Sequence, residues 1–144
     1  MKQKRLGKLP PRYSFILNPY ADVRFTKCPK CRKATRLRKF PLLIHLHETT
    51  PIILGKTCRF CVACELIIAH QGELEALLAN MFTAVNPTAI GHNYLVLGTV
   101  ERTFWRSGLR KAKPLDEMLE HLADFKQYLH VEYRSAVWYP ADEG

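Results

Sequence analysis

Alternating hydrophobic and polar positions predict β-strands along most of the chain. The expected strands are residues 13–17, 40–47, 52–60, 66–70, 94–104 and 130–139. The first should lie at a sheet edge, because Asn18-Pro19 ends it immediately. Residues 40–47 and 52–60 should pair as a hairpin across a turn at residues 48–51.

Two segments change to the spacing of an amphipathic helix. The first spans residues 72–82 and has its hydrophobic stripe at Leu74, Leu77, Leu78, Met81 and Phe82. The second begins at Pro114, after a basic loop at residues 105–113, and has its stripe at Leu115, Met118, Leu119, Leu122, Phe125 and Leu129. Both stripes should pack against a core.

These elements predict an α+β fold in several parts. Residues 1–12 hold five basic side chains and Pro10-Pro11, which indicates a flexible basic arm. Residues 13–82 form a hairpin module with a following helix, and residues 83–93 read as a linker, because they contain Asn86-Pro87 and Gly91. Residues 94–144 should form a β-α-β unit packed against the first module.

Composition narrows the class of protein. A chain of 144 residues that is 47% hydrophobic can bury a core, as one domain or as a domain with a small metal module. No apolar run approaches the roughly 18 residues that a membrane-spanning helix needs. The basic N-terminus lacks the apolar run of a secretory signal, so we expect a cytoplasmic, reducing location.

The formal net charge of +9 is unevenly distributed. Residues 1–47 contain 13 Lys and Arg against the single acid Asp22, whereas residues 48–144 have a charge of −3. Such segregation favours a surface that faces a polyanion. The alternative is that the charge serves solubility alone.

Cysteine spacing gives the most specific chemical signal. Cys28-Pro-Lys-Cys31 is followed about thirty residues later by Cys58-Arg-Phe-Cys61-Val-Ala-Cys64. Four thiolates around one zinc ion form a closed structural site, so one of the five cysteines is left over. We favour Cys61 with Cys64 as the second pair, because Val62 and Ala63 suit a tight turn. Cys58 remains the alternative ligand, or a buried thiol.

Other uses of these residues are less consistent with the sequence. His45 and His47 share one face of a strand and offer replacement ligands, although the cysteines already fill a site. An odd cysteine count disfavours disulfides, and no amphipathic helix follows Cys31, as a redox pair would require.

The two cysteine pairs resemble those of the zinc-ribbon family over about residues 25–70. The resemblance implies two cysteine turns at the ends of short strands and one structural Zn²⁺. It identifies a scaffold and leaves the biological task open.

Nucleic-acid binding, with RNA favoured, is the function that these features predict. Lysines and arginines would contact phosphates, while Trp105, Phe25, Phe40 or Tyr13 would stack on unpaired bases. The expected contact residues are Lys30, Arg32, Lys33, Arg36, Arg38, Trp105, Arg106, Arg110 and Lys111. No base-reading motif is visible, so recognition should depend on phosphate and shape.

Two alternatives come from other functional classes. A zinc-stabilised interaction module or assembly subunit would use the same basic surface to bind an acidic protein partner. An enzyme is disfavoured, because four thiolates close the metal site and no catalytic motif is visible.

Overall fold

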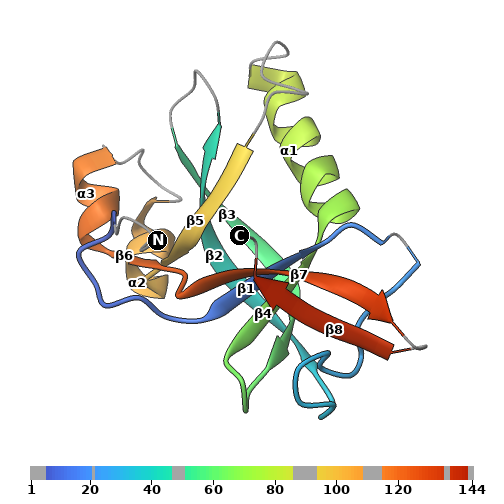
Figure 1. The fold of residues 1–144 in the computed structure, drawn as a ribbon. Helices are drawn as coiled ribbons and strands as arrows, with labels where there is room; N and C mark the ends of the chain where they lie inside the picture. The colour runs from blue at the N-terminus through green and yellow to red at the C-terminus, as the bar shows by residue number, and fades with distance from the viewer. Residues whose placement is uncertain are drawn as a thin grey trace.

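The computed structural model describes residues 6–20, 22–46, 51–85, 94–108, 115–134 and 137–142. Eight strands and three helices lie within these ranges (Figure 1). The strands are β1 (Ser14–Asn18), β2 (Arg36–Leu46), β3 (Ile52–Cys61), β4 (Leu66–His70), β5 (Tyr94–Val100), β6 (Leu122–Asp124), β7 (Gln127–Arg134) and β8 (Val137–Asp142). The helices are α1 (Gln71–Val85), α2 (Arg102–Gly108) and α3 (Leu115–Glu120).

All eight strands join one sheet in the order β6-β5-β2-β3-β4-β1-β7-β8, and the sheet curls strongly (Figure 1). The fold is therefore mixed, with one large sheet and few helices, which agrees with the α+β class in outline. Strands from both halves of the chain pair directly, because β2 pairs with β5 and β1 pairs with β7. The expected C-terminal β-α-β unit does not form, since β5 and β6 pair antiparallel across α2 and α3.

Strand β1 occupies the interior of the sheet, which corrects the expectation of an edge strand. It pairs in parallel with β4 on one side and with β7 on the other. Ile16 is fully buried and Phe15 is 3% exposed, so both faces of the strand are covered. A short apolar run is typical of such a strand.

The hairpin of β2 and β3 is confirmed, with a register that runs from Arg36 opposite Phe60 to Ile44 opposite Ile52. Pro41 lies just before the point where β2 begins to pair with β5, at Leu42. Proline has no backbone N–H to donate there, so it suits the stretch of β2 that β5 leaves uncovered.

Side chains from the two faces of the sheet form separate hydrophobic clusters. Phe15, Phe40 and Phe60 belong to the largest cluster, against which Leu74 and Leu78 of α1 pack. A second cluster includes Ile16, and a third lies under α2 and α3.

Helix α1 is confirmed, and Leu74 and Leu78 are buried as its stripe predicts. Leu77 departs from the expectation, because it is 40% exposed. The side chains of Met81 and Phe82 lie outside the described residues. The helix continues into the expected linker as far as Val85, and residues 86–93 are outside the described ranges.

Three expected elements of the C-terminal half differ from the structure. The strand expected over residues 94–104 ends at Val100, and Phe104 and Trp105 lie in helix α2. The long helix expected after Pro114 is only α3, and Leu122 and Leu129 lie in strands β6 and β7. The apolar side chains fit the spacing of a helical stripe, but the backbone at Leu122 and Leu129 pairs with neighbouring strands instead. The strand expected at residues 130–139 is replaced by the hairpin of β7 and β8.

Residues 6–12, expected as part of a flexible arm, run along the C-terminal half. The amides of Leu6 and Gly7 donate to the Asp124 carboxylate at 3.0 and 2.6 Å. Leu9 forms a parallel bridge with Ala123. Backbone pairing thus fixes this segment, while residues 1–5 lie outside the described ranges. Among the described residues no helix is long and apolar enough to cross a membrane.

Candidate metal centre

Four cysteine sulfurs meet at one end of the sheet. The Sγ atoms of Cys28, Cys31, Cys61 and Cys64 all lie within 4.8 Å of one another. The sulfurs of Cys31 and Cys61 are 3.5 Å apart. This group is the ligand set that the spacing predicts, and it could coordinate one metal ion.

Strand register explains why two distant turns meet here. Arg36 at the start of β2 pairs with Phe60 near the end of β3, so the chain before β2 lies beside the chain after β3. Cys61 is the last residue of β3 and pairs with Leu66 of β4. A bridge between Lys27 and Ala34 closes the loop that carries the first pair.

The two cysteine turns share a backbone design. In each turn, the residue that follows the second cysteine of the pair has a left-handed backbone conformation, with φ of 70° at Arg32 and 49° at Glu65. Non-glycine residues rarely adopt this conformation, and it lets the chain turn sharply away from the sulfurs. In the first turn the amide of Lys30 donates to Cys28 Sγ at 3.3 Å, and the amide of Cys28 donates to the Lys33 carbonyl at 2.8 Å.

The sulfurs sit partly inside the protein. Cys28 and Cys61 are buried against Ile16 and Leu66, while Cys31 and Cys64 are half-buried. A metal ion bound here would tie the two turns to the second hydrophobic cluster.

The surroundings affect the four thiols differently. A hydrogen bond from the Lys33 amide is the main cause that lowers the pKa of Cys31 to about 7. Burial is the main cause that raises the pKa of Cys28, and it raises that of Cys64 to about 12. Without a cation, Cys31 is therefore the thiol of these three that ionises most readily, and a metal would have to displace the protons of the others.

Cys58 and His45 lie away from this centre. Cys58 is 2% exposed within the first hydrophobic cluster, and its thiol donates to the Lys56 carbonyl at 3.4 Å. Burial raises the pKa of Cys58 to about 12. His45 is at the opposite end of β2, and His47 is outside the described residues.

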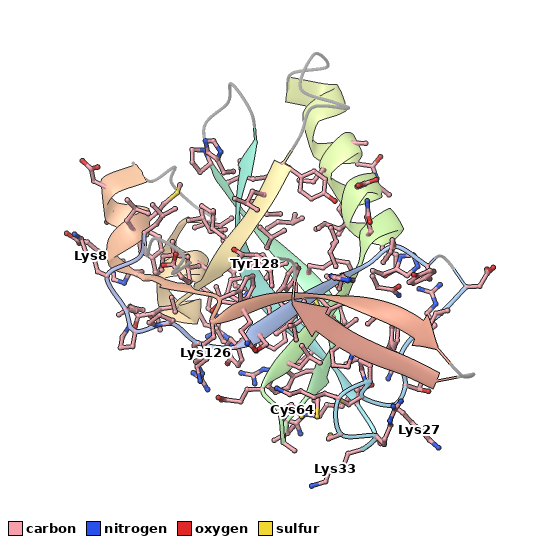
Figure 2. The ribbon with its side chains drawn as sticks, in the orientation of Figure 1. Lys8, Lys27, Lys33, Cys64, Lys126 and Tyr128 are labelled. Atoms are coloured by element: carbon pink, nitrogen blue, oxygen red, sulfur yellow. The ribbon has the colours of Figure 1, made fainter. Side chains whose placement is uncertain are left out.

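Basic side chains surround the metal turn. Lys30, Arg32, Lys33 and Arg36, all expected contact residues, are exposed. Lys27 is exposed beside them, although it is not among the expected contact residues. Its place next to Cys28 in the sequence is the signal that could have predicted this position. Figure 2 shows Lys27 and Lys33 projecting outward at the end of the molecule that carries Cys64.

The other expected contact residues lie elsewhere. Arg38 is half-buried, with its guanidinium 4.9 Å from the centre of the Phe40 ring. Arg106 is exposed on α2, and Arg110 and Lys111 fall outside the described residues.

The aromatic rings expected to stack on bases are used by the core. Tyr13, Phe25 and Phe40 are each 6% exposed or less. Trp105 is half-buried and packs so closely on Gly55 that a Cβ there would lie 2.4 Å from the ring. The Lys39 ammonium also lies over the Trp105 ring, 5.6 Å from its centre. Trp105 therefore caps the third cluster.

Comparison of the chain with protein-family models, with curated proteins and with solved structures found no match in any of the three.

Proposed function

We propose that the chain is a zinc-stabilised protein whose basic metal turn binds nucleic acid through its phosphates. The observation that supports this proposal is the exposure of five cations along residues 27–36, where the sequence has no acid. A zinc ion with four thiolates carries a net charge of about −2. The five cations therefore outnumber the negative charges of the metal centre, and the turn stays positively charged.

Zinc is the metal that best suits four cysteine sulfurs in a closed set. Such a site has no open position for substrate, so we assign the ion a structural role. The two turns at the ends of paired strands fit a zinc-ribbon-like arrangement. A reducing cytoplasm would keep the thiols available for the metal.

The metal would matter for binding because it fixes the backbone that carries the cations. A surface that is already ordered loses less conformational entropy when it meets a phosphate chain. Three of the four candidate aromatic rings are buried, and Trp105 is half-buried against Gly55. Base stacking therefore no longer favours unpaired RNA, and phosphate contact serves RNA and DNA alike.

Two exposed apolar side chains favour a second candidate, an acidic protein partner. Leu37 is 62% exposed and Val62, within the second cysteine turn, is 57% exposed. Apolar contacts flanked by cations are typical of protein interfaces, whereas they add nothing to phosphate binding.

Charge neutralisation tests the first candidate. The triple variant Lys30→Gln, Arg32→Gln, Lys33→Gln should weaken binding of a single-stranded RNA 20-mer and of the matching DNA. The slope of the logarithm of the binding constant against the logarithm of the salt concentration should become shallower by about 0.7 for each phosphate contact that is lost. The control Lys8→Gln, Arg59→Gln, Lys126→Gln removes the same charge from positions outside the metal turn.

The comparison between the two variants decides the outcome. Equal weakening would mean that net charge alone attracts the polymer. Wild-type protein that binds neither polymer would refute the nucleic-acid proposal and leave the acidic partner. Zinc content and melting temperature, measured on both variants, establish that each remains folded.

A further inference from the structure

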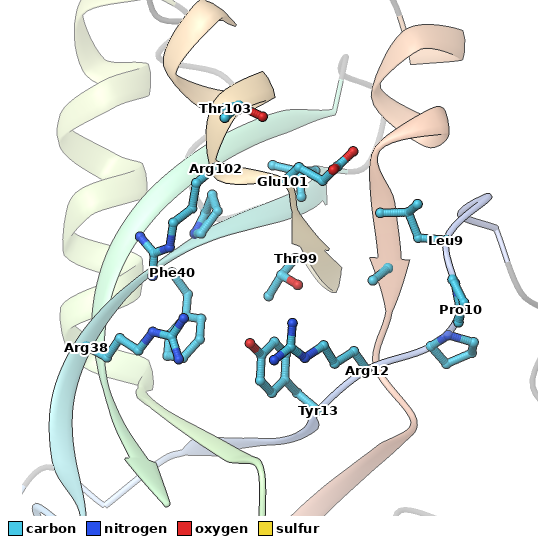
Figure 3. Close-up of a pocket in the computed structure, with 14 residues that line it drawn as sticks. Leu9, Pro10, Arg12, Tyr13, Arg38, Phe40, Thr99, Glu101, Arg102 and Thr103 are labelled. Carbon is cyan, nitrogen blue, oxygen red and sulfur yellow. The ribbon is translucent and has the colours of Figure 1, made fainter. Parts of the chain in front are cut away.

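A pocket of about 630 Å³ opens beside the curled sheet. It lies between the uncovered stretch of β2, the end of β5 and the segment at residues 9–13. Figure 3 shows three arginines reaching this pocket from separate parts of the chain: Arg12 before β1, Arg38 on β2 and Arg102 on α2. The volume is in the usual range for small-molecule sites.

An aromatic cluster beside the pocket positions two of these arginines. The rings of Tyr13, Phe40 and Phe60 meet edge to face, with centres 5.2 to 5.6 Å apart. The Arg38 guanidinium lies 4.9 Å from the centre of Phe40 and 5.4 Å from that of Phe60. The Arg12 guanidinium lies 4.6 Å from the centre of the Tyr13 ring. Stacking of this kind orients a guanidinium and leaves its N–H groups at the edge free to bind an anion.

The third arginine is held by the backbone. Arg102 donates one N–H to the carbonyl of Lys39 at 2.5 Å. This bond uses one of the five donors of the guanidinium, so the others remain for a ligand.

Carboxylates do not balance the three positive charges. Glu101 also lines the pocket, but its carboxylate lies 2.6 Å from His121 Nδ1. Figure 3 shows it on the far side of the pocket from Arg38. Arg12 has one ion pair, with Glu65 at a long 3.7 Å. Within the described part of the chain, neither Arg38 nor Arg102 has an acidic partner.

Backbone strain is located at the same place. Tyr13 has φ of 65°, a left-handed conformation that is unfavourable for an aromatic residue. Flanking hydrogen bonds hold it there, from the Lys126 amide to the Tyr13 carbonyl and from the Ser14 amide to the Glu65 carbonyl. The strained residue directly follows Arg12, whose guanidinium lies over the Tyr13 ring.

We propose that this pocket binds an organic phosphomonoester, with the phosphate between Arg12, Arg38 and Arg102. Arginine forks match the geometry of phosphate oxygens and form charge-assisted hydrogen bonds with them. Leu9, Pro10 and Pro11 line the other side and provide an apolar wall for the body of the ligand. A nucleotide has this combination of parts, either free or as the 5′-phosphorylated end of a strand.

The site is independent of the proposed function of the metal turn, because its arginines are not among the exposed cations of residues 27–36. Failure of one proposal therefore leaves the other standing. The triple variant of the metal turn should bind a mononucleotide as the wild type does.

Calorimetric titration with adenosine 5′-monophosphate, adenosine and inorganic phosphate tests the proposal. We expect the monophosphate to bind and inorganic phosphate to compete with it, while adenosine binds at least about tenfold more weakly. Arg38→Gln and Arg102→Gln should each weaken monophosphate binding by about tenfold or more. Arg59→Gln, on the neighbouring strand β3 and outside this pocket, is the matched control and should change it by less than about twofold.

Two further arms complete the test. Arg38→Lys keeps the charge but loses the fork, so an intermediate loss supports bidentate phosphate binding even if a glutamine variant folds poorly. Short oligonucleotides with a 5′-phosphate or a 5′-hydroxyl identify the source: a preference for the phosphorylated strand over the mononucleotide assigns the pocket to strand ends, and the reverse assigns it to free nucleotides. If the phosphate increases the affinity of neither ligand, or if Arg59→Gln weakens binding as much as Arg38→Gln does, the proposal is wrong.

Discussion

Cys58 and Cys61 are three positions apart on β3, and their sulfurs belong to opposite faces of the sheet. Cys58 is part of the first hydrophobic cluster, and Cys61 is part of the second, beside the metal turns. Successive side chains of a strand alternate between its faces, so an odd separation divides the pair. Cys58-Arg-Phe-Cys61 therefore does not form a metal turn while β3 is extended, and Cys64 completes the set.

Serine substitution should separate these cysteines. Cys64→Ser removes one of four ligands and should abolish stoichiometric zinc. Cys58→Ser should retain zinc and keep a hydrogen bond to the Lys56 carbonyl, with a modest loss of stability from placing a hydroxyl among apolar groups. Elemental analysis of the purified variants measures the ratio of metal to protein. Equal loss from both variants would contradict the assignment.

Removal of the metal should destabilise the end of the sheet that holds the four sulfurs. Structural zinc contributes directly to folding free energy. A loss of about 3 kcal/mol would lower the melting temperature of a chain of this length by roughly 6–12 °C. Hydrogen exchange after chelation should accelerate first at residues 25–35 and 61–66. Uniform acceleration, or none, would show that the ion does not organise these turns.

Glu73 should stabilise the fold by pairing with the buried ammonium of Lys56. The Lys56 Nζ atom lies 3.1 Å from the Glu73 carboxylate, and Lys56 is 5% exposed. Glu73→Gln leaves this ammonium with its hydrogen bond to the Thr57 carbonyl but without a carboxylate, and it should cost about 1–3 kcal/mol in denaturant unfolding. Lys56→Met removes the charge itself and should cost less. A larger loss from Lys56→Met would refute this account.

The same pair predicts a dependence of stability on pH. Hydrogen bonds from Lys56 and then Arg24 lower the pKa of Glu73 in the folded state. Because the folded pKa is below the ordinary value of 4.5, the stabilisation is fully present above that pH. It is lost as the pH falls through the folded pKa. Glu73→Gln should therefore show a shallower acid-induced loss of unfolding free energy than the wild type.

Gly98 should be intolerant of a side chain. A Cβ at this position of β5 would lie 2.2 Å from the Ala123 carbonyl oxygen, which belongs to the paired strand β6. Since backbone cannot move aside cheaply, Gly98→Ala should cost at least about 2 kcal/mol of unfolding free energy. Gly72→Ala is the control: its nearest contact is the His70 ring at 3.3 Å, and alanine favours the helix. Similar losses in both variants would contradict the prediction.

Local signals predict some of these features well. The spacing of Cys28, Cys31, Cys61 and Cys64 identifies the sulfur cluster, and strand alternation predicts the hairpin of β2 and β3. The long helix predicted for the C-terminal half is wrong, because Leu122 and Leu129 fit a helical spacing as well as the two strands that they occupy. Pairing with distant strands decides between these possibilities, and no short window of sequence contains that information.

The arginine pocket also depends on contacts between distant segments, which no short window of sequence contains. Arg12, Arg38 and Arg102 belong to segments that only the curled sheet brings together. Each looks in the sequence like one more cation of a basic protein. Their shared property depends on the aromatic rings beneath them, and those rings are assembled by tertiary packing.

The interior position of β1 determines when the chain can finish folding. Its pairing with β7 joins Ser14 to Gln127, two residues that are far apart along the chain. Closing so long a loop is entropically costly and is associated with slow folding. During synthesis β1 can pair with β4 once residues 66–70 have emerged, but its edge that faces β7 stays unpaired until residues 127–134 emerge. A nascent chain stalled before β7 should therefore expose β1 to chaperones and proteases.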